Sequence, residues 1–312
     1  MAQSDNGTID VHQAETFLTE HLGAPPEDVA PIGAGAWSQC FAFRHGGNDL
    51  VIRFGRYVED FRKDQAAHAY ATLDLPIPEV IEIGTAFDGY FAIATRVWGS
   101  PLETVTAAQW EAVMPEVVAA LETMRRADLS GTAGFGGWDA AGMGSHDSWA
   151  AFLLAVGEDD PGQRTRGGWR DRLAGYPEVA STFAWGYDLL EAVAQVPVPR
   201  GLVHGDLLNR NVLVCDGHID GVFDWGCSLY GDPLYDLAWF EFWEPWHPGV
   251  DVHALRAALM RRWRGLGDVP VALATRLRAC YLRIGLDHLL YNAYLGDGDT
   301  LAATADRMRA LM

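Results

Sequence analysis

The sequence predicts an α+β protein of two lobes, a small β-rich lobe followed by a larger, mostly helical one. Short apolar runs separated by glycine-containing turns dominate residues 1–98, whereas long stretches with apolar residues at helical spacing dominate residues 99–312. The composition, 49% hydrophobic and 21% charged residues, is that of a packed globular chain. We therefore expect two domains, 1–98 and 99–312, with a functional site between them.

The first lobe is expected to hold a leading helix and a small sheet with one inserted helix. Thr8 can cap the leading helix, in which Val11, Ala14 and Phe17 follow at helical spacing. A Gly46-Gly47-Asn48-Asp49 turn predicts a hairpin between two of the strands. The expected strands cover 29–32, 40–44, 50–54, 80–83 and 90–95, and the inserted helix covers 58–73.

The second lobe is expected to be mainly helical. A glycine-rich loop at 131–144 interrupts the helices, and two short strands are expected at 212–215 and 219–223. The expected helices cover 107–126, 149–156, 177–195, 252–264 and 271–295.

Charge and cysteine usage narrow the class of protein. A net charge of −19 opposes binding to nucleic acid or to anionic membranes and favours cationic ligands. The start lacks the pattern of a secretory signal, and no apolar run is long enough to span a membrane. The four scattered cysteines form no Cys-x-x-Cys pair and fit a reducing compartment. We expect a cytoplasmic protein, and a monomer.

The most informative stretch runs from His204 to Asn211 and reads His-Gly-Asp-Leu-Leu-Asn-Arg-Asn, with Asp224-Trp225-Gly226 after a predicted hairpin. Phosphoryl transfer needs a carboxylate to orient and deprotonate the attacking hydroxyl, and oxygen ligands to hold magnesium against the phosphates. The five-residue spacing lets Asp206 face an acceptor while Asn211 faces a metal. Asp224 ends a strand that returns beside this loop. This order of residues predicts a kinase, with Asp206 as catalytic base and Asn211 and Asp224 as metal ligands.

These motifs resemble those of the protein-kinase-like fold, except that Trp225 replaces a phenylalanine. The glycine at position 205, with Gly231-Asp232-Pro233 and Asp236-Leu237-Ala238 downstream, resembles the aminoglycoside and choline kinase branch. The Ala-Pro-Glu segment of protein kinases is absent from the sequence. The resemblance covers nearly the whole chain and implies ATP, with GTP left open, and Mg²⁺ as cofactors.

The resemblance also implies a nucleotide site in the first lobe. Gly33, Gly35 and Ser38 lie between two predicted strands, where a flexible loop can fold over phosphates. Arg53 and Asp64 stand where such kinases carry a lysine and its glutamate partner, and an Arg–Asp pair keeps the charges. Thr95 and Val97 fall at the hinge, where the backbone would receive a purine. We expect these seven residues to bind nucleotide.

Within the family, several further stretches resemble the hygromycin B phosphotransferases. The resemblance implies phosphorylation of a hydroxyl of an aminoglycoside antibiotic, hygromycin B above all, in antibiotic resistance. The stretches lie at 75–80, 134–136, 242–243, 245–246 and 282–287.

Aminoglycosides are polyamines, so their pocket needs carboxylates and flat rings on which sugars can lie. An acidic and aromatic run follows the metal motif, and an acid near the chain's end could join it. Trp239 and Phe240 in this run are expected to be core residues. The candidate substrate-binding residues are Glu241, Trp243, Glu244, Trp246 and Asp287.

Two alternatives stay open at this point. A kinase for another hydroxylated amine or antibiotic, such as choline, a macrolide or methylthioribose, would share the catalytic residues and differ in the acceptor pocket. A nucleotide-binding pseudokinase is suggested only by Arg53 and Asp64, which depart from the usual Lys–Glu pair. The sequence leaves open which hydroxyl is modified, and whether the role is resistance or metabolism.

Overall fold

The computed structural model describes residues 9–35 and 37–312, in which two compact units can be distinguished. Unit 1 contains the described residues up to Pro101 together with Asn211–Gly226, and unit 2 contains Leu102–Arg210 and Cys227–Met312. A single boundary at residue 98 would instead assign Asn211–Gly226 to the later part of the chain. The nucleotide and acceptor roles expected of the two lobes stay predictions.

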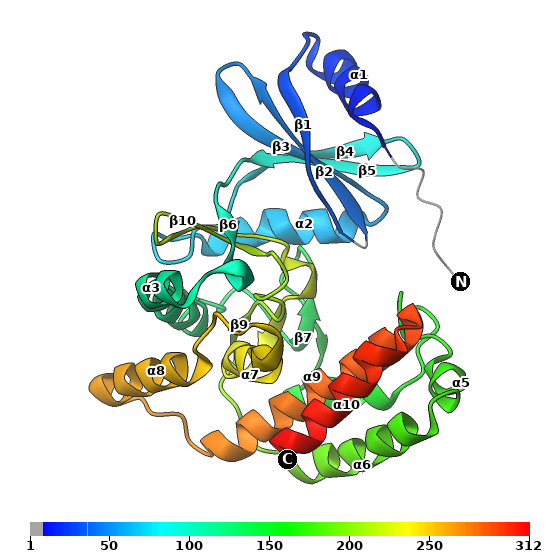
Figure 1. Ribbon diagram of the computed structural model, residues 1–312, viewed down its shortest axis with the longest axis vertical. Coiled ribbons are helices and arrows are strands. Elements are labelled where there is room, and N and C mark those ends of the chain that lie inside the picture. The colour runs from blue at the N-terminus through cyan, green and yellow to red at the C-terminus, as the bar shows by residue number, and fades with distance from the viewer. Residues whose placement is uncertain (1–8, 36) are drawn as a thin grey trace. The chain divides into compact units, whose positions relative to one another are not determined.

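Unit 1 is built on a five-stranded antiparallel sheet with strand order β1-β2-β3-β5-β4 (Figure 1). Arg53 in the central strand lies opposite Cys40 of one neighbour and Ala92 of the other. Since side chains alternate along a strand, Arg53 faces the opposite side of the sheet from Ile52 and Phe54. The strands are β1 Glu27–Ala34, β2 Ser38–His45, β3 Asn48–Gly55, β4 Val80–Ala86 and β5 Gly89–Thr95.

One helix packs against each face of this sheet. Helix α1 (Val11–Leu22) begins after Asp10, whose side chain accepts the N–H of Gln13, and buries Leu18 among the core residues Ile52 and Phe54. The Thr8 cap expected from the sequence lies outside the described residues. Helix α2 (Val58–Ala67) packs Phe61 against Val80 and Ala92, which places α2 on the face of the sheet that Arg53 occupies.

The second segment of unit 1 joins the end of the first segment in a small sheet with strand order β11-β10-β6. Strands β10 (Val212–Cys215) and β11 (His218–Val222) form a hairpin, and β6 (Ser100–Pro101) pairs with the other edge of β10. This hairpin carries the two predicted metal ligands at its ends.

Unit 2 is mostly helical, with α9 (Leu273–Leu295) at its centre. Helix α9 is buried on several sides and packs against α5, α6, α7 and α10. A four-stranded sheet of order β8-β7-β12-β9 completes the unit. The other helices are α3 Ala107–Arg125, α4 Trp149–Leu154, α5 Trp169–Ala174, α6 Pro177–Val193, α7 Tyr235–Trp243, α8 Val252–Leu266 and α10 Gly298–Leu311, and the strands are β7 Phe135–Trp138, β8 Gly144–His146, β9 Gly201–Val203 and β12 Leu229–Gly231.

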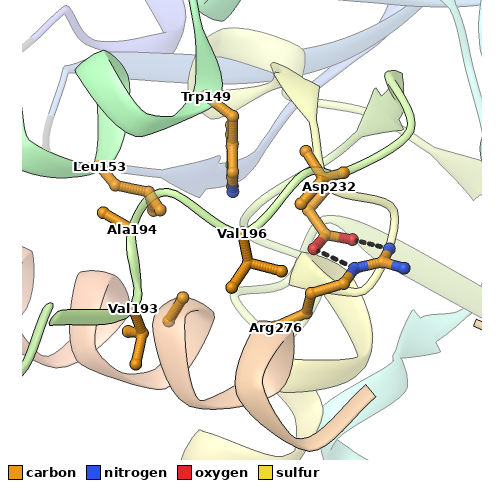
Figure 2. A pocket seen from close by; sticks show the side chains of 9 residues that line it. Trp149, Leu153, Val193, Ala194, Val196, Asp232 and Arg276 are labelled. Carbon is orange, nitrogen blue, oxygen red and sulfur yellow. Dashed lines mark hydrogen bonds and ion pairs between the residues drawn. The ribbon is translucent and has the colours of Figure 1, made fainter. Parts of the chain in front are cut away.

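A buried ion pair ties the chain before α7 to α9. Arg276 on α9 donates two hydrogen bonds to the carboxylate of Asp232, one of them from Nε at 2.8 Å, and the two residues are 3% and 0% exposed. Figure 2 shows this fork beside a small cavity that Trp149, Leu153 and Val193 also line. The cavity has no room for a water molecule, so we regard it as a packing defect.

Among the described residues, no helix combines the length and the apolar composition that crossing a lipid bilayer requires.

Candidate active site

The loop after β9 presents the carboxylate of Asp206. Asp236, in the first turn of α7, accepts the backbone N–H groups of His204 and Gly205 at 2.9 and 2.8 Å, one on each carboxylate oxygen. Burial raises the pKa of Asp236 to about 6, although these two N–H groups act in the opposite direction. Gly205 has φ +78°, a conformation that glycine adopts without strain. The backbone leading to Asp206 is therefore held at two successive residues.

A second contact fixes the Asp206 side chain itself. The Asn209 amide donates to Oδ2 of Asp206 at 3.0 Å, and the Asp206 backbone N–H donates to Nδ1 of His204 at 3.3 Å. The Asn209 bond makes the two carboxylate oxygens unequal, so Asp206 has a defined rotation. Our reading of the sequence missed Asn209, although its place three residues after Asp206 in the same loop was a usable signal.

The β10–β11 hairpin brings Asn211 and Asp224 to the same end of the small sheet. The N–H of Phe223 donates to the carbonyl of Asn211 at 2.9 Å, and Val212 pairs with Val222. Asn211 is buried, whereas the Asp224 side chain is 48% exposed. Asp224 has φ +62°, in the left-handed region, which is strained for a residue with a Cβ.

A hard cation fits these two residues. The half-exposed Asp224 carboxylate and the Asn211 amide oxygen are the ligands that Mg²⁺ prefers, and Mg²⁺ normally keeps several waters or phosphate oxygens as well. Among the described residues there is no cluster of three or more His, Cys, Asp or Glu side chains able to hold a metal. Such a cation would thus depend on a bound phosphate chain for further ligands.

Arg53, Asp64 and Asp224 form a charged cluster in unit 1. An Nη of Arg53 donates to Oδ2 of Asp64 at 2.6 Å, and the other Nη lies 3.7 Å from Oδ1 of Asp224. Burial acts to lower the pKa of Arg53, but the two carboxylates outweigh it and raise the pKa, so the guanidinium stays charged. Burial raises the pKa of Asp64, against the opposing effect of Arg53. The two residues predicted to replace the Lys–Glu pair do form an ion pair.

The predicted phosphate loop closes the β1–β2 hairpin. The N–H of Gly35 donates to the carbonyl of Ser38 at 2.9 Å, and Ala36 lies outside the described residues. A Cβ built on Gly33 or Gly35 would meet nothing within 4 Å, so one side of the loop is open. Phosphate binding by this loop stays a prediction.

In the expected hinge, most backbone N–H groups of residues 95–98 already donate hydrogen bonds within the protein. The backbone N–H of Thr95 donates to the carbonyl of Glu79 at 3.0 Å, and the N–H of Trp98 donates to the side chain of Asp220. The N–H of Arg96 is likewise donated, to the carbonyl of Asp49. Within the described part of the chain, Val97 is the residue of 95–98 whose N–H has no acceptor, so only Val97 could supply a donor to a purine.

In unit 2, aromatic rings extend from the surface inward along α7 and α9. Trp246 is 39% exposed, and its ring centroid lies 5.2 Å from that of Trp243. Trp243 lies 4.6 Å from the ring of His288, which is followed one turn later on α9 by Tyr291. Burial raises the pKa of Tyr291, and the charges of Cys227 and Asp206 act in the same direction. These ring contacts place two predicted substrate residues, Trp243 and Trp246, in one row with His288 and Tyr291.

His288 and Tyr291 contact the predicted substrate residue Trp243 or its neighbour in this row, and our reading of the sequence did not point to either of them. Nδ1 of His288 donates to the carbonyl of Ile284 at 3.1 Å, because a carbonyl can only accept. Burial lowers the pKa of His288, which favours the neutral ring, and in the neutral ring Nε2 is an acceptor. The usable signal was the position of His288 directly after Asp287, on a helix whose other residues are largely apolar.

Asp287 is charged but already paired. Arg166 binds its Oδ1 through Nε at 3.1 Å and through an Nη at 2.5 Å, and Arg283 lies 3.6 Å from the same oxygen. Burial acts to raise the pKa of Asp287, but the two arginines outweigh it and hold the pKa well below the usual range. Its Oδ2 has no partner within residues 9–35 and 37–312, so this oxygen can receive a ligand.

The other two acids have different surroundings. Oε2 of Glu244 accepts from Arg307 at 3.1 Å, while its side chain remains 37% exposed. Glu241 is buried, accepts the hydroxyl of Tyr281, and pairs with Arg256 at 3.0 Å. Both oxygens of Glu241 are thus used inside unit 2, and its surroundings give no support to a substrate role.

Comparison with known proteins gives concordant matches. The phosphotransferase enzyme family matches residues 28–269. Hygromycin-B 4-O-kinase of Escherichia coli is 31% identical over 301 residues, 96% of this chain and 84% of that protein. The crystal structure of aminoglycoside phosphotransferase APH(4)-Ia has a TM-score of 0.85 at 30% identity, with 97% of this chain and 98% of that chain covered. The ternary complex of a thermostable mutant of APH(4)-Ia with AMP-PNP and hygromycin B has a TM-score of 0.83 at 32% identity, with 95% and 97% covered.

Proposed function

This chain belongs to the phosphotransferase enzyme family, and from that membership we propose that it transfers the γ-phosphoryl group of ATP to a hydroxyl of hygromycin B. The observation that carries the proposal is the identity to hygromycin-B 4-O-kinase, which extends over 96% of the chain and so includes both the catalytic loop and the acceptor region. The AMP-PNP and hygromycin B held by a solved relative support the choice of both substrates. The 4-hydroxyl is the acceptor position that the name of the E. coli relative suggests.

In this proposal Asp206 orients the acceptor hydroxyl and takes its proton as the phosphoryl group is transferred. The Asn209 bond to Oδ2 supports this role, because it fixes the carboxylate before the acceptor arrives. The two N–H bonds from the loop to Asp236 add rigidity to the same element.

Nucleotide binding is proposed for unit 1. Arg53 is charged and held by Asp64, so it can bind phosphate oxygens without first being desolvated or oriented. Asn211 and Asp224 would hold Mg²⁺, which when bound neutralises the charge of the phosphates. Gly33, Gly35 and Ser38 would cover the phosphates, and the Val97 N–H would donate a hydrogen bond to the purine edge.

Acceptor binding is proposed for unit 2. The rings of Trp243 and Trp246 provide a flat surface for the sugars, and His288 offers a neutral acceptor for a hydroxyl or ammonium group. Oδ2 of Asp287 and the exposed carboxylate of Glu244 would bind ammonium groups. We place the reaction in the cytoplasm, where ATP is available, and the absence of a disulfide among the four cysteines, all of which lie in the described residues, agrees with a reducing compartment.

Transfer of labelled phosphate from ATP, with Mg²⁺ present, tests the proposal. The acceptors are hygromycin B, other aminoglycosides, a macrolide and choline, and NMR of the product identifies the modified hydroxyl. We expect transfer to hygromycin B, and a loss of about 10²–10⁴ in turnover for Asp206→Ala, because a positioned base is removed. Asp206→Asn is the matched control for shape, since it keeps the volume and removes the base.

Each outcome has a distinct meaning. Transfer to choline or a macrolide but to no aminoglycoside would contradict the substrate and leave the kinase chemistry. Near-normal turnover in a folded Asp206→Ala protein would contradict the role of Asp206. ATP binding without transfer to any acceptor would favour the pseudokinase alternative.

A further inference from the structure

Lys63 is the only lysine in the 312 residues, against 22 arginines that make up the rest of the 23 basic side chains. It lies on α2 and is 7% exposed. A buried ammonium group is costly unless its protons are well bonded. Nζ of Lys63 donates to the backbone carbonyl of Gly226 at 3.0 Å. The single lysine is therefore directed at the turn that carries Asp224.

The next residue of α2 holds the same turn from another side. Oδ1 of Asp64 accepts the backbone N–H of Trp225 at 2.6 Å, while its Oδ2 binds Arg53. Two adjacent helical residues thus bond two adjacent residues of the turn, one through its N–H and the other through its carbonyl. A side chain placed on Gly226 would meet Asp224 Oδ1 at 3.5 Å, so this backbone lies directly beside the carboxylate.

The backbone of Asp224 needs such support. Its φ of +62° lies in the left-handed region, which a residue with a Cβ adopts at a cost. A conformation of this kind persists when surrounding bonds determine it. The bonds to Trp225 and Gly226 lie immediately after Asp224 and fix the direction in which the chain leaves it.

We propose that Lys63 positions a ligand of magnesium. Together with Asp64, Lys63 clamps the backbone of the Asp224-Trp225-Gly226 turn at two points. The inference rests on the proposed role of Asp224 as a metal ligand. It assigns to α2 a second task beside the Arg53–Asp64 pair, namely to hold the metal ligand in its strained conformation.

The charge of Lys63 and its hydrogen bond have opposite effects on the affinity for Mg²⁺. A cation close to a metal site repels Mg²⁺, so removal of the charge alone would strengthen metal binding. Removal of the clamp would weaken metal binding, because Asp224 would spend time in other backbone conformations. The direction of the change in Mg²⁺ affinity therefore separates the two roles.

The test uses the full-length protein with Lys63→Met, which removes the donor and the charge, and Lys63→Arg, which keeps both. Gln65→Met is the matched control, because Gln65 lies on the same helix and its amide also donates to a backbone carbonyl, that of Val80 at 3.2 Å. Two readouts are used at a temperature where all variants are folded. They are amide hydrogen exchange at 224–226 without metal, and Mg²⁺ titration of ATP binding by calorimetry.

We expect Lys63→Met to raise amide exchange of the turn and the Mg²⁺ concentration for half-maximal ATP binding, each roughly tenfold, as for the loss of a charged hydrogen bond. Lys63→Arg should keep the amide exchange and the Mg²⁺ requirement close to those of the wild type, and Gln65→Met should change neither quantity. An Mg²⁺ requirement that is unchanged or lower in Lys63→Met would overturn the proposal, as would exchange equal to that of Gln65→Met. If the wild type itself shows no Mg²⁺-dependent ATP binding, the proposed function fails instead, and the exchange data still decide whether the clamp exists.

Discussion

At the scale of single residues, Asp236 places a charge in the interior of unit 2. Its carboxylate receives two N–H groups of the catalytic loop and, in the described part of the chain, no cation. Burial raises its pKa from 3.8 to about 6. Between pH 4 and pH 6 the folded chain therefore binds a proton that the unfolded chain does not. The stability contributed by this proton is complete below pH 4 and is lost as the pH rises through 6.

Asp236→Asn isolates this effect because it keeps the shape and removes the titration. We expect the free energy of unfolding of the wild type, minus that of Asp236→Asn, to rise by on the order of 2–3 kcal/mol from pH 7 to pH 4. Turnover should move in the opposite direction and fall more steeply below pH 6 in the wild type, since a neutral carboxyl holds the loop less firmly. Urea unfolding measures the stability difference, and kcat measures turnover, both between pH 4 and pH 7. A stability difference that does not vary with pH would mean that Asp236 titrates at its ordinary pKa.

Contacts of a single side chain could be predicted from the sequence where its partner is close along the chain. The spacing of Arg53 and Asp64 follows from a strand and the next helix, and the structure contains their ion pair. Glu241 was expected to face substrate because buried acids are rarely unpaired, yet Tyr281 and Arg256, 40 and 15 residues away, satisfy it. No sequence pattern around Glu241 predicts those partners. The roles of the catalytic, metal and acceptor residues themselves stay predictions.

At the scale of elements, β3 and α2 meet through the Arg53–Asp64 pair. Asp64 is buried and the Arg53 side chain is 17% exposed, their N–O distance is 2.6 Å, and the Arg53 guanidinium also packs on the ring of Phe61 at 5.1 Å. On the neighbouring strands, Arg44 and Asp49 form a second ion pair at 3.5 Å, but both side chains are nearly half exposed. The two pairs share a sheet and differ in burial, so they can be compared directly.

A double-mutant cycle with Arg53→Met and Asp64→Asn measures the buried pair. Asn at position 64 keeps an oxygen for the Trp225 N–H, so mainly the ion pair is lost. We expect a coupling free energy of roughly 1–3 kcal/mol in ATP-analogue affinity and in unfolding, and under about 0.5 kcal/mol for the Arg44→Met and Asp49→Asn control cycle. Arg53→Lys should keep partial activity, because the charge survives without the fork. Additive effects on nucleotide affinity at positions 53 and 64 would show that the pair does not position phosphates.

The elements were predicted best where periodicity was strong. The strands of the five-stranded sheet and the helices α3, α6, α8 and α9 lie within a few residues of their expected positions. The helix expected over 58–73 ends as an α-helix at Ala67 and continues as a short 3-10 turn, His68–Tyr70. Helix α10 was not expected. Strands β7, β8, β9 and β12 were not expected either, because three or four residues leave little period to detect and no clear hairpin turn marks them as it does β10 and β11.

At the scale of the whole molecule, the predicted α+β, protein-kinase-like fold is confirmed by the similarity to APH(4)-Ia over nearly the full chain. The fold class followed from the change in periodicity at residue 99 and from the catalytic motifs. The membership of Asn211–Gly226 in unit 1 could not be predicted in this way. It depends on the pairing of β10 with β6, more than 100 residues earlier, and such long-range pairing has no signature in local sequence.

The charge of the whole molecule leads to the last prediction. Around the proposed acceptor residues, Asp287 is matched by Arg166 and Arg283, and Glu244 by Arg307, so the local charge is not strongly negative. The attraction for a cationic acceptor must then come largely from the net charge of −19, which salt screens over about 10 Å at 0.1 M.

We expect the KM for hygromycin B to rise by roughly fivefold or more between 0.05 and 0.5 M salt at saturating Mg²⁺, while the KM for the anionic ATP stays constant or falls. Glu244→Gln should change the KM for the drug by less than about threefold, because one partly exposed, paired acid contributes little to the field of the whole molecule. Fully N-acetylated hygromycin B is the control, since it has lost its positive charges and its KM should not respond to salt. Equal salt dependence for the drug, its acetylated form and ATP would locate the effect in the stability or the chemistry of the enzyme instead of in the attraction of a cation. A KM that rises more with Glu244→Gln than with salt would mean that local pairing, and not the net charge, holds the acceptor.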